Sequence, residues 1–152
     1  MKSLKTFLLL AFCTMAIAGC QSYGKEYKLD SNHNVYYKGE GLDEAVAKKL
    51  ANYLKDEKYF QDGKEATVQI TKSKDTFNLN FVYNKDMVNE SIESGFLIFG
   101  AGISKTVFGG DPVTIHLCNN KLESFKNIGY CKAKEETPEV TPGPGANNDV
   151  PQ

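Results

Sequence analysis

The 152-residue sequence contains no arginine and no tryptophan, so all 18 of its basic side chains are lysines. Arginine is the usual bidentate reader of phosphate groups and guanine edges. The formal net charge is -1 at pH 7. A protein that binds nucleic acid usually carries an excess of positive charge, which this chain lacks. Base composition in an AT-rich genome also explains the missing arginine. Tyrosine and phenylalanine remain as candidate anchors of a protein interface.

Histidine is scarce as well, since His33 and His116 are the only two. They form no metal-ligand motif with the cysteines and no paired nucleophile and base. The segment Gly109-Gly110-Asp111-Pro112 precedes an expected strand and not a helix N-terminus, so it is interpreted as a turn and not as a phosphate-binding loop. We therefore expect no catalytic residue, no metal site and no cofactor.

No apolar run reaches the ~20 residues that a membrane-spanning helix needs. A shorter run does occur near the N-terminus, where two lysines within the first five residues precede an apolar stretch over residues 6–17. Small residues then come directly before Cys20. This order of positive, apolar and small residues predicts a secretory signal peptide over residues 1–19.

Residues Ile17-Ala18-Gly19-Cys20 resemble the lipobox of bacterial lipoproteins. The resemblance implies that Cys20 becomes the mature N-terminus, carries acyl chains such as palmitate, and anchors the protein to a membrane of the cell envelope. Gln21 and Ser22 follow with no Asp beside the cysteine, which by similarity to Gram-negative sorting implies the outer membrane. The alternatives are a plain secretory signal with a coincidental cysteine and a buried N-terminal helix.

Two cysteines, Cys118 and Cys131, lie outside the signal segment and are not the lipidation site. In an oxidising envelope this pair predicts a structural disulfide. Twelve intervening residues do not fit a C-x-x-C redox motif, and the histidines supply no zinc motif.

Polar, turn-rich residues 20–34 are interpreted as the lipidated cysteine and a tether. Residues 132–152 contain four of the five prolines and are interpreted as a disordered tail. The folded domain is therefore expected over residues 35–131.

Within this domain, apolar residues recur at every second position in some segments, as in strands, and at every third or fourth position in others, as in helices. The expected elements are a strand at 35–37, a helix at 42–54, strands at 67–71 and 76–83, a helix at 86–107, and a hairpin of 113–118 and 122–128. Asn84 or Asp86 is the expected cap of the second helix. Gly95, Gly100 and Gly102 inside that helix predict a close approach to the sheet or a bend. The alternative is a segment that inserts into a membrane or binds a partner.

These elements predict an α+β, two-layer sandwich in which two helices cover one face of an antiparallel sheet of about five strands. Each half contains a helix followed by a hairpin, with Val68-Gln69-Ile70 matching Val113-Thr114-Ile115, which is typical of a duplicated unit. The order of the expected elements, which begins with the strand segment Tyr36-Tyr37-Lys38-Gly39, resembles that of the TATA-binding-protein-like and ferredoxin-like sandwiches. It also resembles that of small bacterial envelope proteins. No functional residue is carried over by that resemblance.

The expected function is non-enzymatic binding of a protein or an envelope polymer by a membrane-anchored domain. The candidate surfaces are the free sheet face and the pair Tyr36 and Tyr37, which are expected to place one ring on each face of an edge strand. One alternative is an inhibitor or immunity-type protein. The other is a small hydrolase that uses clustered carboxylates, and its candidate residues are Asp43, Glu44, Asp56, Glu57, Asp86, Glu90 and Glu93.

Overall fold

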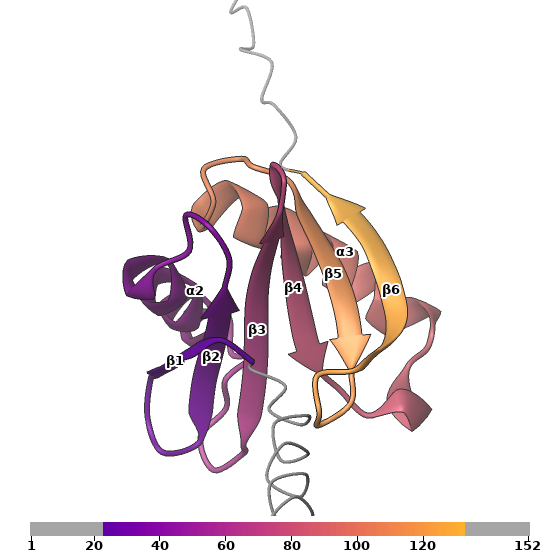
Figure 1. Ribbon diagram of the computed structural model, residues 1–152. Helices are drawn as coiled ribbons and strands as arrows, with labels where there is room; N and C mark the ends of the chain where they lie inside the picture. Colours follow the sequence, from indigo (N-terminus) through magenta and orange to yellow (C-terminus); the bar gives the residue numbers. More distant parts are fainter. Residues whose placement is uncertain (1–22, 133–152) are drawn as a thin grey trace, which may run out of the picture.

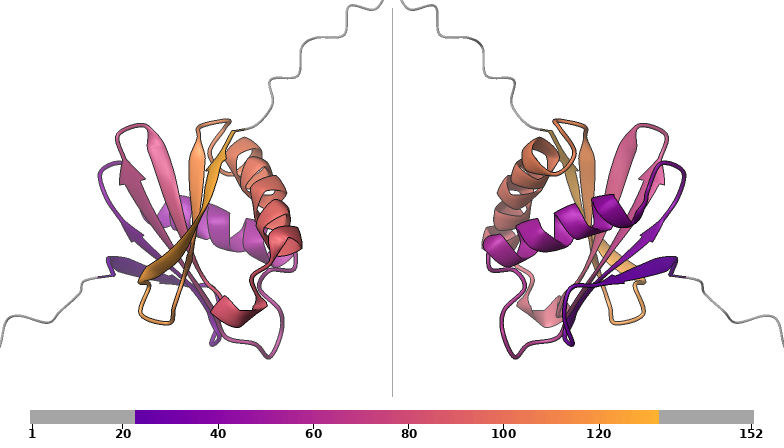
Figure 2. Two further views of the ribbon diagram at one scale, coloured as in Figure 1. Left: turned by 90° about the vertical axis from the view of Figure 1, so that its right-hand side faces the viewer. Right: turned by 90° about the vertical axis from the view of Figure 1, so that its left-hand side faces the viewer.

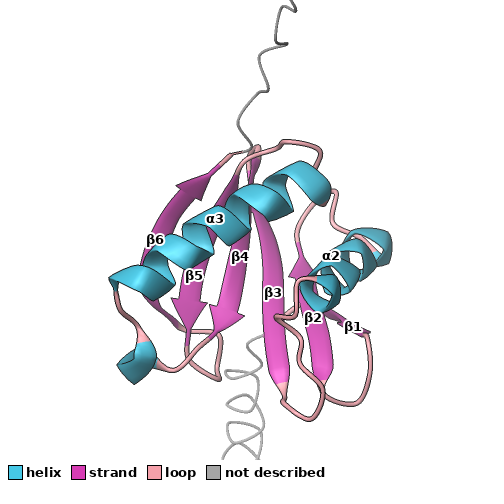
Figure 3. Ribbon diagram, turned by 180° about the vertical axis from the view of Figure 1, so that it is seen from behind, coloured by secondary structure: helices cyan, strands magenta, loops and turns pink. Residues whose placement is uncertain are grey.

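The fold is a two-layer α+β sandwich, known from a computed structural model that describes residues 23–132. Figure 1 shows the sheet with both helices behind it, and Figure 3 shows the helices from their own side. In chain order the elements are β1 (Lys25–Lys28), β2 (His33–Lys38), α2 (Glu44–Asp56), β3 (Ala66–Ser73), β4 (Thr76–Val82), the 3-10 turn η1 (Lys85–Met87), α3 (Glu90–Thr106), β5 (Val113–Cys118) and β6 (Ser124–Cys131). The expected signal peptide, Cys20 and all but the first residue of the expected tail lie outside the described residues.

The sheet has six strands in the order of the sequence, from β1 to β6. Three antiparallel hairpins, β1/β2, β3/β4 and β5/β6, are joined side by side by two parallel pairs, β2/β3 and β4/β5. The predicted α+β class with two helices is confirmed, but the sheet is mixed and has six strands where about five antiparallel strands were expected. Each helix is a crossover that returns the chain to the same end of the sheet, and the strand after it must run parallel to the strand before it.

The additional strand is β1, which lies in the segment that was expected to be a tether. Its sequence is polar and gives no apolar alternation, so its pairing with β2 is formed by backbone hydrogen bonds. The preceding Gly24 has a φ of 100°, and a Cβ atom there would overlap the carbonyl oxygen of Tyr37. A glycine is thus required where the chain enters the sheet.

Both helices begin at a side-chain cap. Asp43 accepts a hydrogen bond from the backbone N–H of Val46, and Asn89 accepts one from that of Ile92. The expected cap Asn84 instead begins η1, so α3 starts later than predicted. The two helices lie side by side on one face of the sheet (Figure 2), as the amphipathic pattern predicts.

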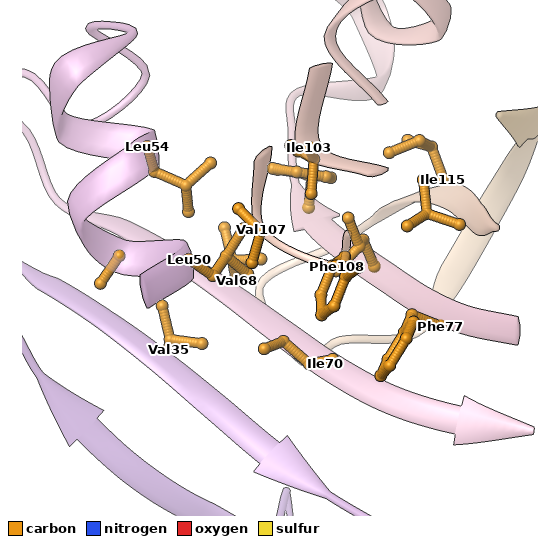
Figure 4. Packing of buried hydrophobic residues seen from close by; sticks show 14 of the residues in the cluster. Val35, Leu50, Leu54, Val68, Ile70, Phe77, Ile103, Val107, Phe108 and Ile115 are labelled. Carbon is orange, nitrogen blue, oxygen red and sulfur yellow. The ribbon is translucent and has the colours of Figure 1, made fainter. Parts of the chain in front are cut away.

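The core lies between these helices and the apolar side of the sheet (Figure 4). Phe77 and Phe108 stack with ring centroids 4.0 Å apart, which closes one end of it. Fully buried side chains come from both layers and include Val35, Leu50, Leu54, Val68, Ile70, Leu79, Phe81, Ile103, Val113, Ile115 and Leu117.

Glycine sets the distance between α3 and the last hairpin. A Cβ atom at Gly100 would lie 2.6 Å from the sulfur of Cys131 and 3.1 Å from Ile115, so only glycine allows this approach. The close approach predicted for the helix is confirmed at this position. Gly95, by contrast, has nothing within 4 Å of such an atom. Among the described helices, none is long and apolar enough to cross a membrane.

The structure contains the repeated order that the sequence suggests, α2–β3–β4 followed by α3–β5–β6. The matched positions Val68 and Val113 are both fully buried, and so are Ile70 and Ile115. The two units therefore place equivalent side chains in the core.

Candidate functional site: the open sheet face

The side of the sheet that neither described helix covers, here called the open face, is built mainly of amide and hydroxyl side chains. Strand register aligns one outward residue from every strand into a continuous line, called the central row. Its members are Glu26, Tyr36, Gln69, Asn80, His116 and Asn127. Because side chains alternate along a strand, the neighbours of these residues on β2, β3, β4 and β5 point into the core.

Hydrogen bonds fix the middle of the central row. The side-chain amide of Asn80 donates to Oε1 of Gln69 at 2.7 Å, and Nε2 of Gln69 donates to the backbone carbonyl of Tyr23 at 2.9 Å. Gln69 is only 8% exposed because Tyr23 lies over it. The row is therefore held in one orientation before any ligand binds.

A second hydrogen-bonded line lies next to the central row. Thr67 donates its hydroxyl to Oδ1 of Asn34 at 2.7 Å, and Nδ2 of Asn34 donates to Glu26 at 2.8 Å. These three side chains form one wall of a hollow of about 220 Å³. Its other lining residues are Lys28, Asp30, Ser31, Asn32, His33 and Glu65. The lining consists mainly of oxygen and amide groups.

The floor of the hollow contains His33, a residue that the sequence did not single out. Its ring is 3% exposed and stacks on Phe60 with centroids 4.7 Å apart. Nδ1 lies 2.7 Å from a carboxylate oxygen of Asp30, and Nε2 lies 3.1 Å from the carbonyl oxygen of Gln61. Both partners are hydrogen-bond acceptors, so each ring nitrogen of His33 faces an oxygen atom. The hydrogen bond from His33 holds the pKa of the Asp30 carboxyl below its usual value.

Among the outward strand positions of the open face, formal charge is confined to the first two strands, where Glu26, Lys28 and Lys38 lie. Asp30 and Glu65 add negative charge in the loops that line the hollow. Burial raises the pKa of Tyr36, and the nearby Glu26 adds to this shift. Burial lowers the pKa of His116, which favours a neutral imidazole. The outward positions of β3, β4 and β5 are therefore uncharged at neutral pH.

The two predicted binding tyrosines are separated by the sheet. Tyr36 lies on the open face with its ring centroid 5.7 Å from that of Tyr23. Tyr37 is 7% exposed and belongs to the core. The expected edge strand is in fact an interior strand, because β1 pairs with it. Tyr36 thus remains a candidate contact, and Tyr37 has a structural role.

The predicted disulfide is wrong for this structure, in which Cys118 and Cys131 are both free and buried. Register places Cys118 opposite Ser124, whereas Cys131 lies opposite Val113 at the other end of the hairpin. Five residues of strand separate these positions by ~17 Å, far beyond the ~7 Å limit between bridged Cα atoms. The hairpin register, which the sequence left open, prevents the bond.

The seven acidic residues considered for a hydrolase lie at three places. Asp43 and Glu44 lie at the start of α2, whereas Asp56 and Glu57 lie at its end, ~20 Å away. The other three lie in and around the start of α3, where Glu93 pairs with Lys126 at 2.8 Å. Within residues 23–132, no three His, Cys, Asp or Glu side chains form a group that could hold a metal ion.

A second, larger hollow of about 640 Å³ lies on the helical side. Its apolar lining includes Tyr59, Phe96 and Phe99, and charged residues Glu57, Lys58, Lys64 and Glu65 lie around it. The two signs of charge are balanced there, so the hollow has no charge preference of its own.

Together these features define a two-layer α+β domain with one sheet face covered and the other polar and uncovered. Residues 27–129 match the model of the AF_1994_N family, described as a family N-terminal domain, and the chain belongs to that family. The match runs from β1 into β6. No curated protein and no solved structure matches the chain significantly.

Proposed function

We propose that this protein is a lipid-anchored lipoprotein of the bacterial cell envelope, and that its domain binds a polyhydroxylated ligand, a glycan, without chemical turnover. The observation that carries the proposal is the central row, a preorganised line of amide, phenol and imidazole groups across the open face.

Glycans present many hydroxyl groups and little apolar surface, so they are recognised by groups that donate and accept at the same time. Asn and Gln side chains do both, and so does neutral His116. An uncharged centre avoids the desolvation cost that a buried charge would add. The rings of Tyr23 and Tyr36 offer an apolar body beside a polar tip. The hollow of about 220 Å³ is below the usual ~300–1,000 Å³ of drug-sized sites, which suits one sugar unit.

The anchor is supported by the lipobox-like residues at 17–20. A thioether-linked lipid with several chains would hold the domain at a membrane, since each buried CH₂ contributes ~0.8 kcal/mol. We place it at the outer membrane because no Asp follows Cys20.

Two measurements test this proposal. The intact mass of the membrane-bound protein is expected to correspond to a chain that begins at Cys20 with added acyl groups, and Cys20→Ser is expected to release the protein from membranes. Titration of the Cys20→Ser protein with envelope oligosaccharides is expected to show saturable binding that Asn80→Ala weakens. A matched substitution on the helical side, Lys48→Ala, should leave the affinity unchanged.

Other outcomes would select a different function. A single tight protein partner in cross-linked membranes, with no affinity for oligosaccharides, would indicate the inhibitor or immunity-type alternative. Turnover of an envelope substrate that is lost when two of the acidic residues are replaced would indicate a hydrolase.

A further inference from the structure

The described chain begins on the open face itself. Tyr23 accepts the hydrogen bond from Gln69 and lies against Tyr36, and Gly24 packs against the backbone of β2. In Figure 1 this indigo start of the described chain crosses in front of the sheet, on the side away from the helices. The connection to Cys20 therefore leaves from the open face and not from the rim of the domain.

Only Gln21 and Ser22 separate Cys20 from Tyr23. Three Cα–Cα steps span at most ~11 Å. The structure thus shortens the expected fourteen-residue tether to two residues, because β1 and the start of β2 occupy the rest of it. An acylated Cys20 would hold Tyr23 within this distance of the lipid headgroups.

That distance determines which side of the domain faces the membrane. Tyr23 lies over β3, the third of six strands, so the edges of the sheet are two and three strand spacings away, ~10 and ~14 Å. A link of ~11 Å reaches the nearer edge but does not also span the helical layer behind the sheet, which is ~10 Å thick, so the helices cannot turn towards the bilayer. The open face is then the side held against the membrane, and the helices point away from it.

The chemistry of the open face suits that position. Tyrosine is enriched where proteins meet the membrane–water interface, and Tyr23, Tyr36 and Tyr130 lie on this face, the last 61% exposed. Strands β3, β4 and β5 present no formal charge on it, so the face has no strong preference for anionic lipid over neutral lipid. Amide and hydroxyl groups match the hydroxyls of a sugar headgroup.

We propose that the open face is held flat against the membrane and binds sugar-bearing lipid headgroups in that same bilayer. This inference rests on the proposed lipid anchor and names the source of the proposed glycan. The hollow beside Asn34 and Thr67 receives a sugar unit that projects from the headgroup layer.

The test uses acylated protein purified from membranes and reconstituted in vesicles with or without a glycosyl lipid. A photoreactive residue replaces Thr114, a half-buried open-face position beside the central row, or Lys48, an exposed position on α2. The expected result is a several-fold excess of lipid adducts at position 114 over position 48, with a further increase when the glycosyl lipid is present.

A flexible insertion between Ser22 and Tyr23 separates tethering from binding. About 20 Gly and Ser residues add ~25 Å of mean reach. With this insertion, adducts at position 114 should fall to the level of position 48 in vesicles without glycosyl lipid, and should persist where that lipid is present.

Each other outcome has a defined meaning. Adducts of equal yield at both positions in acylated protein would overturn the orientation. An open-face excess that ignores the glycosyl lipid would overturn the headgroup specificity. A mass that shows an unmodified Cys20 would instead overturn the lipid anchor on which the inference rests, and this result is read before any cross-linking.

Discussion

The two faces of the sheet share the same backbone and the same six strands, yet they carry different side chains. The covered face presents Val35, Leu79 and Phe81 to the helices, and these side chains are fully buried. Asn80 lies between Leu79 and Phe81 on β4, and its side chain belongs to the hydrogen bonds of the open face. Strand alternation separates the residues that form the core from those of the proposed binding face, so substitutions at adjacent positions should affect different properties.

The largest expected difference is between neighbours on β4. Phe81→Ala removes a fully buried ring and should lower the free energy of unfolding by ~3–5 kcal/mol. Asn80→Ala removes one hydrogen bond to Gln69 and should cost ~1 kcal/mol. Urea unfolding followed by circular dichroism measures both. Equal losses would show that the open face also carries the fold.

A smaller difference is expected between two glycines of α3. Gly100→Ala forces a methyl group against Cys131 and Ile115 and should cost ~1–3 kcal/mol. Gly95→Ala meets no atom within 4 Å and should stabilise the helix by up to ~1 kcal/mol.

Removing the obstructing sulfur provides the control. The double variant Gly100→Ala/Cys131→Ala should lose less stability than the sum of its single variants, because the new methyl group occupies space that the sulfur leaves. Additive losses would mean that Gly100 is needed for a reason other than this contact.

A weaker effect is expected from acid. Burial lowers the pKa of His116 in the folded protein, so the unfolded chain binds the proton more readily. Stability should therefore decrease as pH falls through the ordinary histidine range near ~6.5 and recover as pH rises. The His116→Asn variant should lose this part of the pH dependence. A wild-type profile that is matched by the variant would contradict the prediction.

The smallest expected effect is that of reducing agent, which should not change the unfolding midpoint because Cys118 and Cys131 form no bond. Burial raises the pKa of Cys118 to about 11, so both thiols should react with an alkylating reagent slowly when folded and rapidly in urea. An unfolding midpoint that is lowered by reducing agent would contradict this prediction and indicate that the disulfide forms.

The amphipathic patterns predicted both helices and five of the six strands, because side-chain burial determines those elements. For example, Leu50 and Leu54 recur along the buried side of α2. Strand β1 gave no such signal, since Lys25 to Lys28 contribute backbone pairing and little apolar burial. The same omission made Tyr36 and Tyr37 look like residues of an edge strand.

The polarity of the free face was partly predictable, because Asn78 and Asn80 alternate with apolar residues. The central row was not, since it depends on the register between strands. Register also decides that Cys118 and Cys131 lie apart, and the sequence alone does not specify which residues of a hairpin face one another.

The most direct test of the separate roles of the two faces is an NMR titration of the Cys20→Ser protein with the soluble glycoside of a lipid headgroup. Side-chain amide signals report on both faces, because Asn34, Gln69 and Asn80 lie on the open face and Asn52 is exposed on α2. Our account predicts saturable shifts for the three open-face amides and none for Asn52. Shifts at Asn52 alone, or none at all, would contradict it.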